Sequence, residues 1–157
     1  MSQQKKLRIN SKFGKITLVE CGGFLTHLIF EKGCGDGTTH NDESAVLLQA
    51  KKQLEEYFDG GRKVFDIPLR PAGGEFFRRV WQVMLDDVAF GTTITYGGLG
   101  KLVGSPKGAR AIGMANNKNP IPIIIPCHRV VGANGSLTGY AFGLDIKQKL
   151  LELEGLI

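Results

Sequence analysis

The residues with the clearest chemical potential are Pro126-Cys127-His128-Arg129, where a thiol is followed by an imidazole and a guanidinium. A thiol is a strong nucleophile only as its thiolate, and neighbouring histidine and arginine side chains favour the thiolate. A cysteine that follows an isoleucine run such as residues 121–125 is by itself most often an inert core residue. Pro122 and Pro126, however, remove backbone donors from that run, so we expect it to leave its sheet near Cys127. The pattern therefore predicts a nucleophilic thiol on a turn.

A nucleophilic thiol needs a base, and His128 is the nearest candidate. Consecutive residues of an extended segment point to opposite sides, so a bend or a bridging water must link the imidazole to the thiol. A third group, usually a carboxylate, should orient the imidazole. The C-terminal stretch 150–155 offers Glu152 and Glu154, of which Glu154 lies at an expected helix end before a glycine. Taken alone, either glutamate would be a solvated surface charge.

Residues 7–74 predict the first part of the framework that must position this chemistry. Short runs rich in Ile, Leu, Val and Phe between Leu7 and Phe30, separated by glycines, predict a small antiparallel sheet. Asp42 is expected to cap a helix that ends before Gly60-Gly61. Residues 62–74 contain two prolines and are interpreted as a strand followed by a linker.

The rest of the chain is expected to be mainly helical. Helices are predicted for about residues 75–87, for 96–103, from Ser105 as the cap to about Asn116, and for about 144–153. The second and third of these, joined at Gly104, resemble a helix-turn-helix. The last is expected to turn three apolar side chains inward, namely Ile146, Leu150 and Leu153.

Composition restricts the function without identifying it. The 157 residues carry a net charge of +5, which is compatible with a polyanionic partner. Three cysteines, an odd number, argue against a disulfide scaffold and for a reducing compartment. No segment approaches the roughly 20 apolar residues of a membrane span, and no apolar signal core follows the N-terminus. We expect a cytoplasmic protein without a membrane partner.

The active-site stretch also carries a family resemblance. Residues 119–132 (NPIPIIIPCHRVVG) and 135–140 (GSLTGY) closely resemble the signature of the O6-alkylguanine-DNA alkyltransferases, which are suicide DNA-repair proteins. The similarity extends from about Phe76 to Gly155, whereas residues before about Asp42 match only in pattern. The resemblance implies an α/β fold, with an N-terminal ribonuclease-H-like domain of a small sheet and a helix at residues 1–70. A mostly helical DNA-binding and alkyl-transfer domain would follow at residues 75–157.

The resemblance implies a role for each matching residue of the transfer site. Cys127 would accept the alkyl group, His128 would act as base through a water, and Glu154 would orient the imidazole. Tyr96 would contact the flipped guanine and help protonate its leaving oxygen, and Asn119 would brace the active-site turn. The substrate pocket would be formed by three further residues: Val130, Tyr140 and Ala141.

The resemblance also implies the mode of DNA binding. The helix after Gly104 would enter the minor groove of double-stranded DNA, and Arg110 would replace the extruded O6-alkylguanine in the stack. The groove is only about 6 Å wide, which suits the small residues Ala109, Ala111 and Gly113. An alkyl group on guanine O6 is buried in the duplex, so the base must leave the stack before in-line attack. We expect a monomer that uses no cofactor, and activity on O4-alkylthymine stays open.

Three features depart from the family pattern. Phe142 stands where many relatives have glycine, and would restrict bulky alkyl groups or pack outward. Gly97, Gly98 and Gly100 are expected to leave their helix easily frayed, at up to about 1 kcal/mol each relative to alanine. Some relatives carry an N-terminal zinc site, but Cys21 and His27 have no second matching pair. Cys34 and His40 fit no familiar zinc spacing, so no metal is predicted.

Three other functions were weighed against the alkyltransferase. A Cys/His hydrolase would use the same nucleophile but gives no reason for the helix-turn-helix. A non-catalytic alkyl-lesion binder would share the fold, although such relatives lack the acceptor cysteine that is present here. A transcriptional regulator would prefer one sequence in undamaged DNA.

Overall fold

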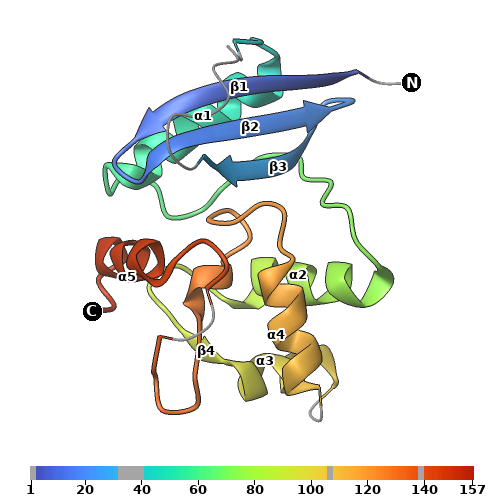
Figure 1. The fold of residues 1–157 in the computed structure, drawn as a ribbon, viewed down its shortest axis with the longest axis vertical. Helices are drawn as coiled ribbons and strands as arrows, with labels where there is room; N and C mark the ends of the chain where they lie inside the picture. Colours follow the sequence, from blue (N-terminus) through green and yellow to red (C-terminus); the bar gives the residue numbers. More distant parts are fainter. Residues whose placement is uncertain (1–2, 32–40, 106–107, 138–139) are drawn as a thin grey trace. The chain divides into compact units, whose positions relative to one another are not determined.

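The computed structural model describes residues 3–31, 41–105, 108–137 and 140–157. The chain forms two compact units, Met1–Ala72 and Gly73–Ile157 (Figure 1). Several residues singled out in the sequence lie outside the described part, namely Cys34, His40, Pro106, Lys107, Thr138 and Gly139.

The first unit is a three-stranded antiparallel sheet with one helix, as predicted. Strands β1 (Gln4–Ser11), β2 (Gly14–Cys21) and β3 (Phe24–Phe30) follow one another in the order β1-β2-β3. Helix α1 (Ala45–Phe58) lies along one face of the sheet (Figure 1). Leu18 and Leu28 from the sheet and Leu47 and Leu54 from α1 are buried, so apolar contacts between sheet and helix form the core.

Two expectations for this unit were wrong. The cap of α1 is Ser44, whose hydroxyl accepts from the Leu47 amide at 3.3 Å, whereas Asp42 pairs with Lys6 of β1 through its own amide and carboxylate. A side-chain oxygen of either Asp42 or Ser44 can cap a helix. Because Asp42 bonds to β1, Ser44 caps α1. Residues 62–74 form no strand, and only Leu69 makes an isolated bridge, to Leu25. Proline cannot donate to a ladder, which limits pairing on both sides of Leu69.

The second unit is mainly helical. Its helices are α2 (Glu75–Asp87), α3 (Tyr96–Val103), α4 (Ala109–Asn117) and α5 (Leu144–Leu153), and three of these have the predicted bounds. The short strands β4 (Ile94–Thr95) and β5 (Val130–Val131) pair in parallel. This pairing brings the start of α3 beside the chain that follows Cys127, as the orange and yellow segments near β4 show in Figure 1.

Helix α3 is capped at both ends despite its glycines. The Thr95 hydroxyl accepts from the Gly98 amide at 2.9 Å, and Gly104 ends the helix at a φ of 84°. A Cβ on Gly100 would lie 3.0 Å from the Ser105 carbonyl oxygen, whereas a Cβ on Gly97 would meet nothing. Gly100 is therefore needed for close packing. Gly97 has no such packing role, so it lowers the helix propensity of α3 without a compensating contact.

Helix α4 begins later than predicted. Its N-cap is Gly108 and its first residue is Ala109, so Ser105 is not the capping residue. The Ser105 carbonyl instead accepts from the Gly108 amide at 2.9 Å and closes the turn before the helix. Trp81 of α2 donates its indole N–H to the Ala115 carbonyl at 2.9 Å, which fixes α4 against α2.

The inward face of α5 also differs from the prediction. Leu150 is buried as expected, but Ile146 and Leu153 are only half-buried. Lys147 and Leu151 are buried in their place. None of the helices in the described ranges is long and apolar enough to cross a membrane.

Candidate active site

The isoleucine run before Cys127 is a turn and not the strand that its composition suggested. The Ile125 amide donates to the Ile121 carbonyl at 2.9 Å, and Ile123 has a φ of 74°. A β-branched residue rarely adopts this left-handed conformation, at a cost of about 1–3 kcal/mol. The chain then enters a single 3₁₀ turn, Cys127–Arg129. A strained turn thus presents the thiol, as the two prolines predicted.

Two buried asparagines hold this turn in place. Asn119 donates from Nδ2 to the Ile125 carbonyl at 2.9 Å, and its Oδ1 accepts from the Ile121 amide at 2.9 Å. Asn116, in the last turn of α4, donates to the Cys127 carbonyl at 3.3 Å. The sequence analysis selected Asn119 and missed Asn116, which connects α4 directly to the cysteine backbone.

The Cys127 thiol is fully buried and lies beside a phenol. Its Sγ lies 3.8 Å from the Tyr140 hydroxyl oxygen. Burial raises the pKa of the thiol above its ordinary value, while hydrogen bonds from Asn119 and Tyr140 and the charge of Lys147 act in the opposite direction. The raised pKa favours the protonated thiol over the thiolate in this buried state.

A hydrogen-bonded ionic group lies behind the thiol. His128 Nε2 lies 2.6 Å from Glu154 Oε2, and both side chains are completely buried. Arg129 donates from Nε to Glu154 Oε1 at 2.8 Å and from Nη2 to Oε2 at 3.0 Å, and also reaches the Val88 carbonyl. The expectation that Arg129 favours the thiolate was therefore wrong, because its guanidinium pairs with Glu154 in a two-pronged ion pair.

The ion pair with Arg129 decides the state of the imidazole. Because the Glu154 charge is already balanced by Arg129, His128 can stay neutral and donate its Nε2 hydrogen to Glu154. Burial lowers the pKa of His128 below its ordinary value, although the hydrogen bond and charge of Glu154 act against this shift. Nδ1 then carries a lone pair, and it has no hydrogen-bond partner within the described part of the chain. The arrangement provides a buried proton acceptor.

Lys147 is a functional candidate that the sequence analysis missed. Its Nζ donates to the Val130 carbonyl at 2.6 Å and lies 5.8 Å from the centre of the Tyr140 ring. Burial lowers the pKa of this amine, and the neighbouring Cys127 raises it. One signal in the sequence pointed to it, because Lys147 lies three residues before Leu150 and seven before Glu154, on one face of α5.

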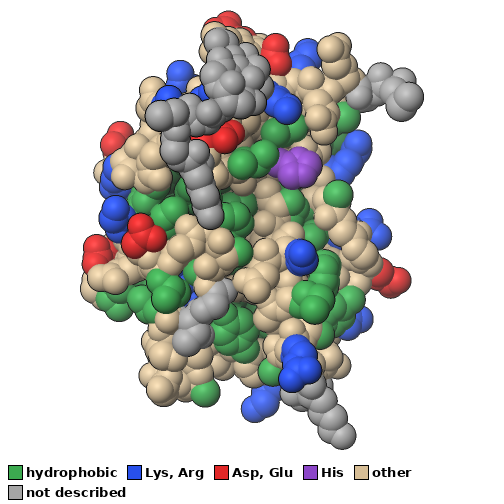
Figure 2. Space-filling view, viewed as in Figure 1, with side chains coloured by type: hydrophobic (Ala, Val, Ile, Leu, Met, Phe, Trp, Pro, Cys, Tyr) green, Lys and Arg blue, Asp and Glu red, His purple; other side chains and the backbone are tan. Residues whose placement is uncertain are grey.

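Five of the remaining predicted residues line a cavity of about 920 Å³ beside α4. Its lining includes Tyr96, Ala109, Arg110, Gly113 and Ala141, which the sequence predicted, together with Met114, Asn117 and Lys118, which it did not. A Cβ on Gly113 would meet no atom within 4 Å, so this helix face is open. Hydrophobic and basic side chains are both visible over α4 in the space-filling view (Figure 2).

Three other predicted residues lie apart from the lining of this cavity. Ala111 is exposed on α4. Val130 is buried, and its carbonyl accepts from Lys147. Tyr140 is 8% exposed beside the thiol, and the ring of Phe142 packs against it at a centroid distance of 5.3 Å and an angle of 69°. Phe142 thus packs against the side chain of Tyr140.

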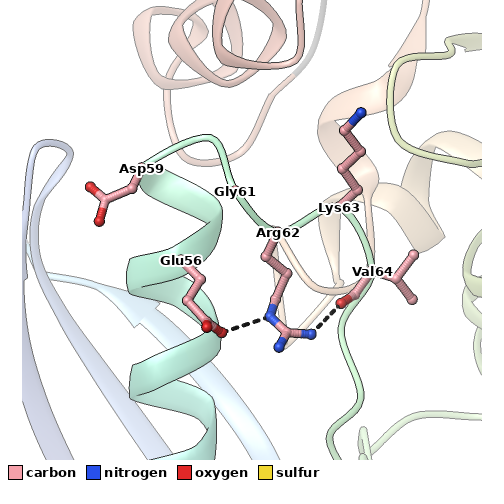
Figure 3. Close-up of a pocket in the computed structure, with 6 residues that line it drawn as sticks. All are labelled: Glu56, Asp59, Gly61, Arg62, Lys63 and Val64. Carbon is pink, nitrogen blue, oxygen red and sulfur yellow. Dashed lines mark hydrogen bonds and ion pairs between the residues drawn. The ribbon is translucent and has the colours of Figure 1, made fainter.

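The first unit contains a second cavity, of about 650 Å³, at the end of α1 (Figure 3). Arg62 donates to Glu56 at 2.9 Å and to the Val64 carbonyl at 2.8 Å, as the dashed lines in Figure 3 mark. These groups satisfy one another's hydrogen bonds on a partly exposed surface, which indicates a structural role. Within the described ranges, no group of three or more His, Cys, Asp or Glu side chains could hold a metal ion.

Comparisons with known proteins agree over both units. The family model described as 6-O-methylguanine DNA methyltransferase, ribonuclease-like domain, matches residues 6–71, and the DNA binding domain of the same description matches residues 75–156. A methylated-DNA–protein-cysteine methyltransferase of Methanosarcina acetivorans is 49% identical over 150 residues, which cover 92% of this chain and 94% of that protein. A protein of the same name from Mycobacterium tuberculosis is 43% identical, covering 93% and 89%.

Solved structures give the same result. The M. tuberculosis O6-methylguanine methyltransferase superposes with a TM-score of 0.86 at 40% identity, covering 97% of this chain and 93% of that one. M. tuberculosis OGT in complex with DNA gives a TM-score of 0.85 at 41% identity, covering 96% and 92%. The predicted α/β fold class, with a ribonuclease-like sheet unit before a mostly helical unit, is therefore confirmed.

Proposed function

The chain belongs to the 6-O-methylguanine DNA methyltransferase family and repairs DNA by alkyl transfer to a cysteine, and we propose that this cysteine is Cys127. The observation that carries the assignment is the buried thiol with the His128–Glu154–Arg129 group behind it. Cys21 is half-buried in the first unit, whereas His128, Arg129 and Glu154 all belong to the second.

The proposed reaction begins with proton transfer from the thiol. The Cys127 proton passes through a water to Nδ1 of His128, and Glu154 stabilises the imidazolium that forms. Sγ then attacks the alkyl carbon, and the bond from that carbon to guanine O6 breaks. The electron pair stays with guanine, which takes a proton from the Tyr96 hydroxyl, and the proton held by His128 returns through solvent to the Tyr96 oxygen. The net change moves one alkyl group from oxygen to sulfur and one proton from sulfur to guanine, without a cofactor.

The remaining side chains of the site hold the reacting groups in place. Asn119 and Asn116 fix the turn, so that Sγ keeps one position relative to the cavity. Lys147 is a buried cation that favours the thiolate as it forms, while burial keeps the resting thiol protonated. We interpret this combination as protection of a thiol that reacts once and cannot be regenerated.

The chain binds DNA, and we propose that the substrate is O6-alkylguanine flipped out of a duplex through its minor groove. Exposed Arg110 lies at the cavity edge among small residues of α4, which suits a helix that approaches a narrow groove. Arg110 would fill the space that the base leaves, with α3 and α4 acting as the DNA-binding pair. A monomer suffices, because all the residues of the proposed site come from Gly73–Ile157 of one chain.

The raised pKa of Cys127 argues against a Cys/His hydrolase. Such enzymes hold a reactive thiolate whose pKa is depressed by a neighbouring imidazolium. Here burial raises the pKa of the thiol and lowers that of the imidazole, so the neutral pair is favoured.

Intact mass after incubation with an O6-methylguanine duplex tests the proposal. We expect a gain of one methyl group per protein molecule, with peptide mapping placing it on Cys127. Cys127→Ser should bind the lesion duplex yet gain no methyl group, because a serine hydroxyl is far harder to ionise. Cys21→Ser is the matched control and should react as the wild type does. Methyl transfer to Cys21 or Cys34, or repeated turnover, would contradict the assignment.

A further inference from the structure

Met114 is the large apolar side chain that α4 leaves most open to solvent. It is 53% exposed, although it follows Gly113 and precedes the buried Ala115. Burying an exposed methionine is favourable by an amount of the order of 1 kcal/mol, so a ligand that packs against Met114 would gain from the contact.

The position of Met114 relates it to the proposed DNA contact. It lies four residues after Arg110 on α4, and side chains with that spacing are neighbours on one helix face. Both side chains line the cavity of about 920 Å³, together with Tyr96 and Ala141 from outside the helix. Met114 and the small alanines bring apolar side chains to this lining, whereas Arg110 and Lys118 bring positive charge to the same place.

We propose that Met114 is a further substrate-binding residue that contacts the flipped guanine base within this cavity. The thioether of methionine is polarizable and makes favourable contacts with the edges of aromatic rings, each worth about 0.3–1.5 kcal/mol. A purine offers such a ring, and the unbranched side chain of Met114 can adjust to alkyl groups of different size. The inference rests on the proposed function, and it separates two tasks on one helix face: Arg110 holds the duplex open and Met114 holds the base.

The test compares a paired lesion with a base that needs no extrusion. Single-turnover rates are measured on an O6-methylguanine duplex and on the free base O6-methylguanine, over a range of concentrations, for the wild type, Met114→Ala, Met114→Leu and Arg110→Ala. Met114→Ala should slow both substrates by about two- to tenfold, the range that a sulfur–aromatic contact can give. Met114→Leu should recover part of the loss. Arg110→Ala should slow the duplex far more than the free base.

The controls distinguish the possible failures. Leu85→Ala removes another exposed apolar side chain, from α2 and away from the cavity lining, and should leave both rates unchanged. If Met114→Ala keeps the wild-type rate on either substrate that the wild type accepts, Met114 does not hold the base. If no methyl group reaches Cys127 of the wild type from either substrate, the proposed function itself fails.

Discussion

The two units bury polar side chains for different purposes. In the first unit, Glu20 accepts from the Gly23 amide at 3.0 Å and Gln53 bonds the backbone of Asp66, so each completes a turn or loop. Among the described residues of the second unit, six polar or charged ones are buried: Asn116, Asn119, His128, Arg129, Lys147 and Glu154. These six hold the active-site turn or form the ionic group behind the thiol.

This difference shows where the molecule retains costly interactions for function. A buried ion pair is often no more stabilising than apolar packing of the same volume, because both charges lose their hydration. An ionic cluster in the core of the second unit is therefore weak evidence for stability and good evidence for chemistry. The first unit has an apolar core between sheet and helix and carries its ion pairs near the surface, as at Arg62 and Glu56.

The largest expected effect comes from breaking one ion pair in each unit. Arg129→Met leaves the fully buried Glu154 charge without its guanidinium and should destabilise the second unit by about 3–5 kcal/mol. Arg62→Met breaks a partly exposed pair with Glu56 and should cost only about 0–1 kcal/mol. Urea denaturation followed by tryptophan fluorescence, from Trp81 in the second unit, and by circular dichroism measures both. Equal losses of unfolding free energy in the two variants would contradict the distinction between the two cores.

The next effect concerns chemistry rather than stability. Glu154→Gln should slow single-turnover methyl transfer by roughly ten- to a hundredfold, because the base His128 loses the carboxylate that stabilises its protonated form. Glu56→Gln, in the ion pair of the first unit, is the matched control and should leave the rate unchanged. DNA affinity, measured by fluorescence anisotropy, should stay near the wild-type value in both variants. An unchanged rate in Glu154→Gln would exclude Glu154 from the proton relay.

A smaller effect tests how closely the helices of the second unit pack. Gly100→Ala places a Cβ 3.0 Å from the Ser105 carbonyl oxygen and should destabilise by about 1–3 kcal/mol. Gly97→Ala meets no atom and should stabilise by about 0.4–1 kcal/mol, since it lowers the entropy of the unfolded chain. Thermal unfolding of the two variants gives the comparison. Stabilisation by both substitutions would mean that α3 frays, as its glycine content predicts.

The last prediction uses one histidine from each unit. Burial lowers the pKa of both His27 and His128, with the Lys6 charge adding to the shift at His27 and Glu154 opposing it at His128. Below pH 6.5, which is the ordinary pKa of histidine, the unfolded chain binds protons that the folded chain does not. The stability that depends on these histidines is therefore complete above pH 6.5 and is lost as the pH falls from there. Urea midpoints between pH 5 and 8 should show this loss, and His27→Gln should reduce it. A midpoint that rises on acidification would contradict the shifts.

The methyl-transfer rate provides a second pH readout. Because the pKa of His128 is lowered below 6.5, more than half of the imidazole is neutral at pH 6.5, and the single-turnover rate there should stay above half of the rate at pH 7.5. A rate that halves at pH 6.5 would indicate an ordinary histidine and argue against the buried, neutral state.

Local patterns predicted a large part of the second unit. The bounds of α2, α3 and α5 follow from apolar spacing and from Gly104 at the end of α3, whereas the Thr95 cap of α3 was not predicted. The predicted start of α4 and the predicted cap of α1 were wrong, because Ser105 and Asp42 make other hydrogen bonds with the backbone. The distance between His128 and Glu154 agrees with the role suggested by family resemblance, although that role stays a prediction.

The sequence by itself determined the fold class and the cysteine motif, because helical spacing, glycine and proline positions and a contiguous signature are local properties of the chain. Only the tertiary structure decided that Arg129 pairs with Glu154, that Lys147 turns inward to the Val130 carbonyl, and that Asn116 bonds the Cys127 backbone. The partners in these contacts are 25, 17 and 11 residues apart. These polar side chains have no local preference for burial. Their direction is set by the buried polar groups that still need a hydrogen-bond partner once the chain has packed.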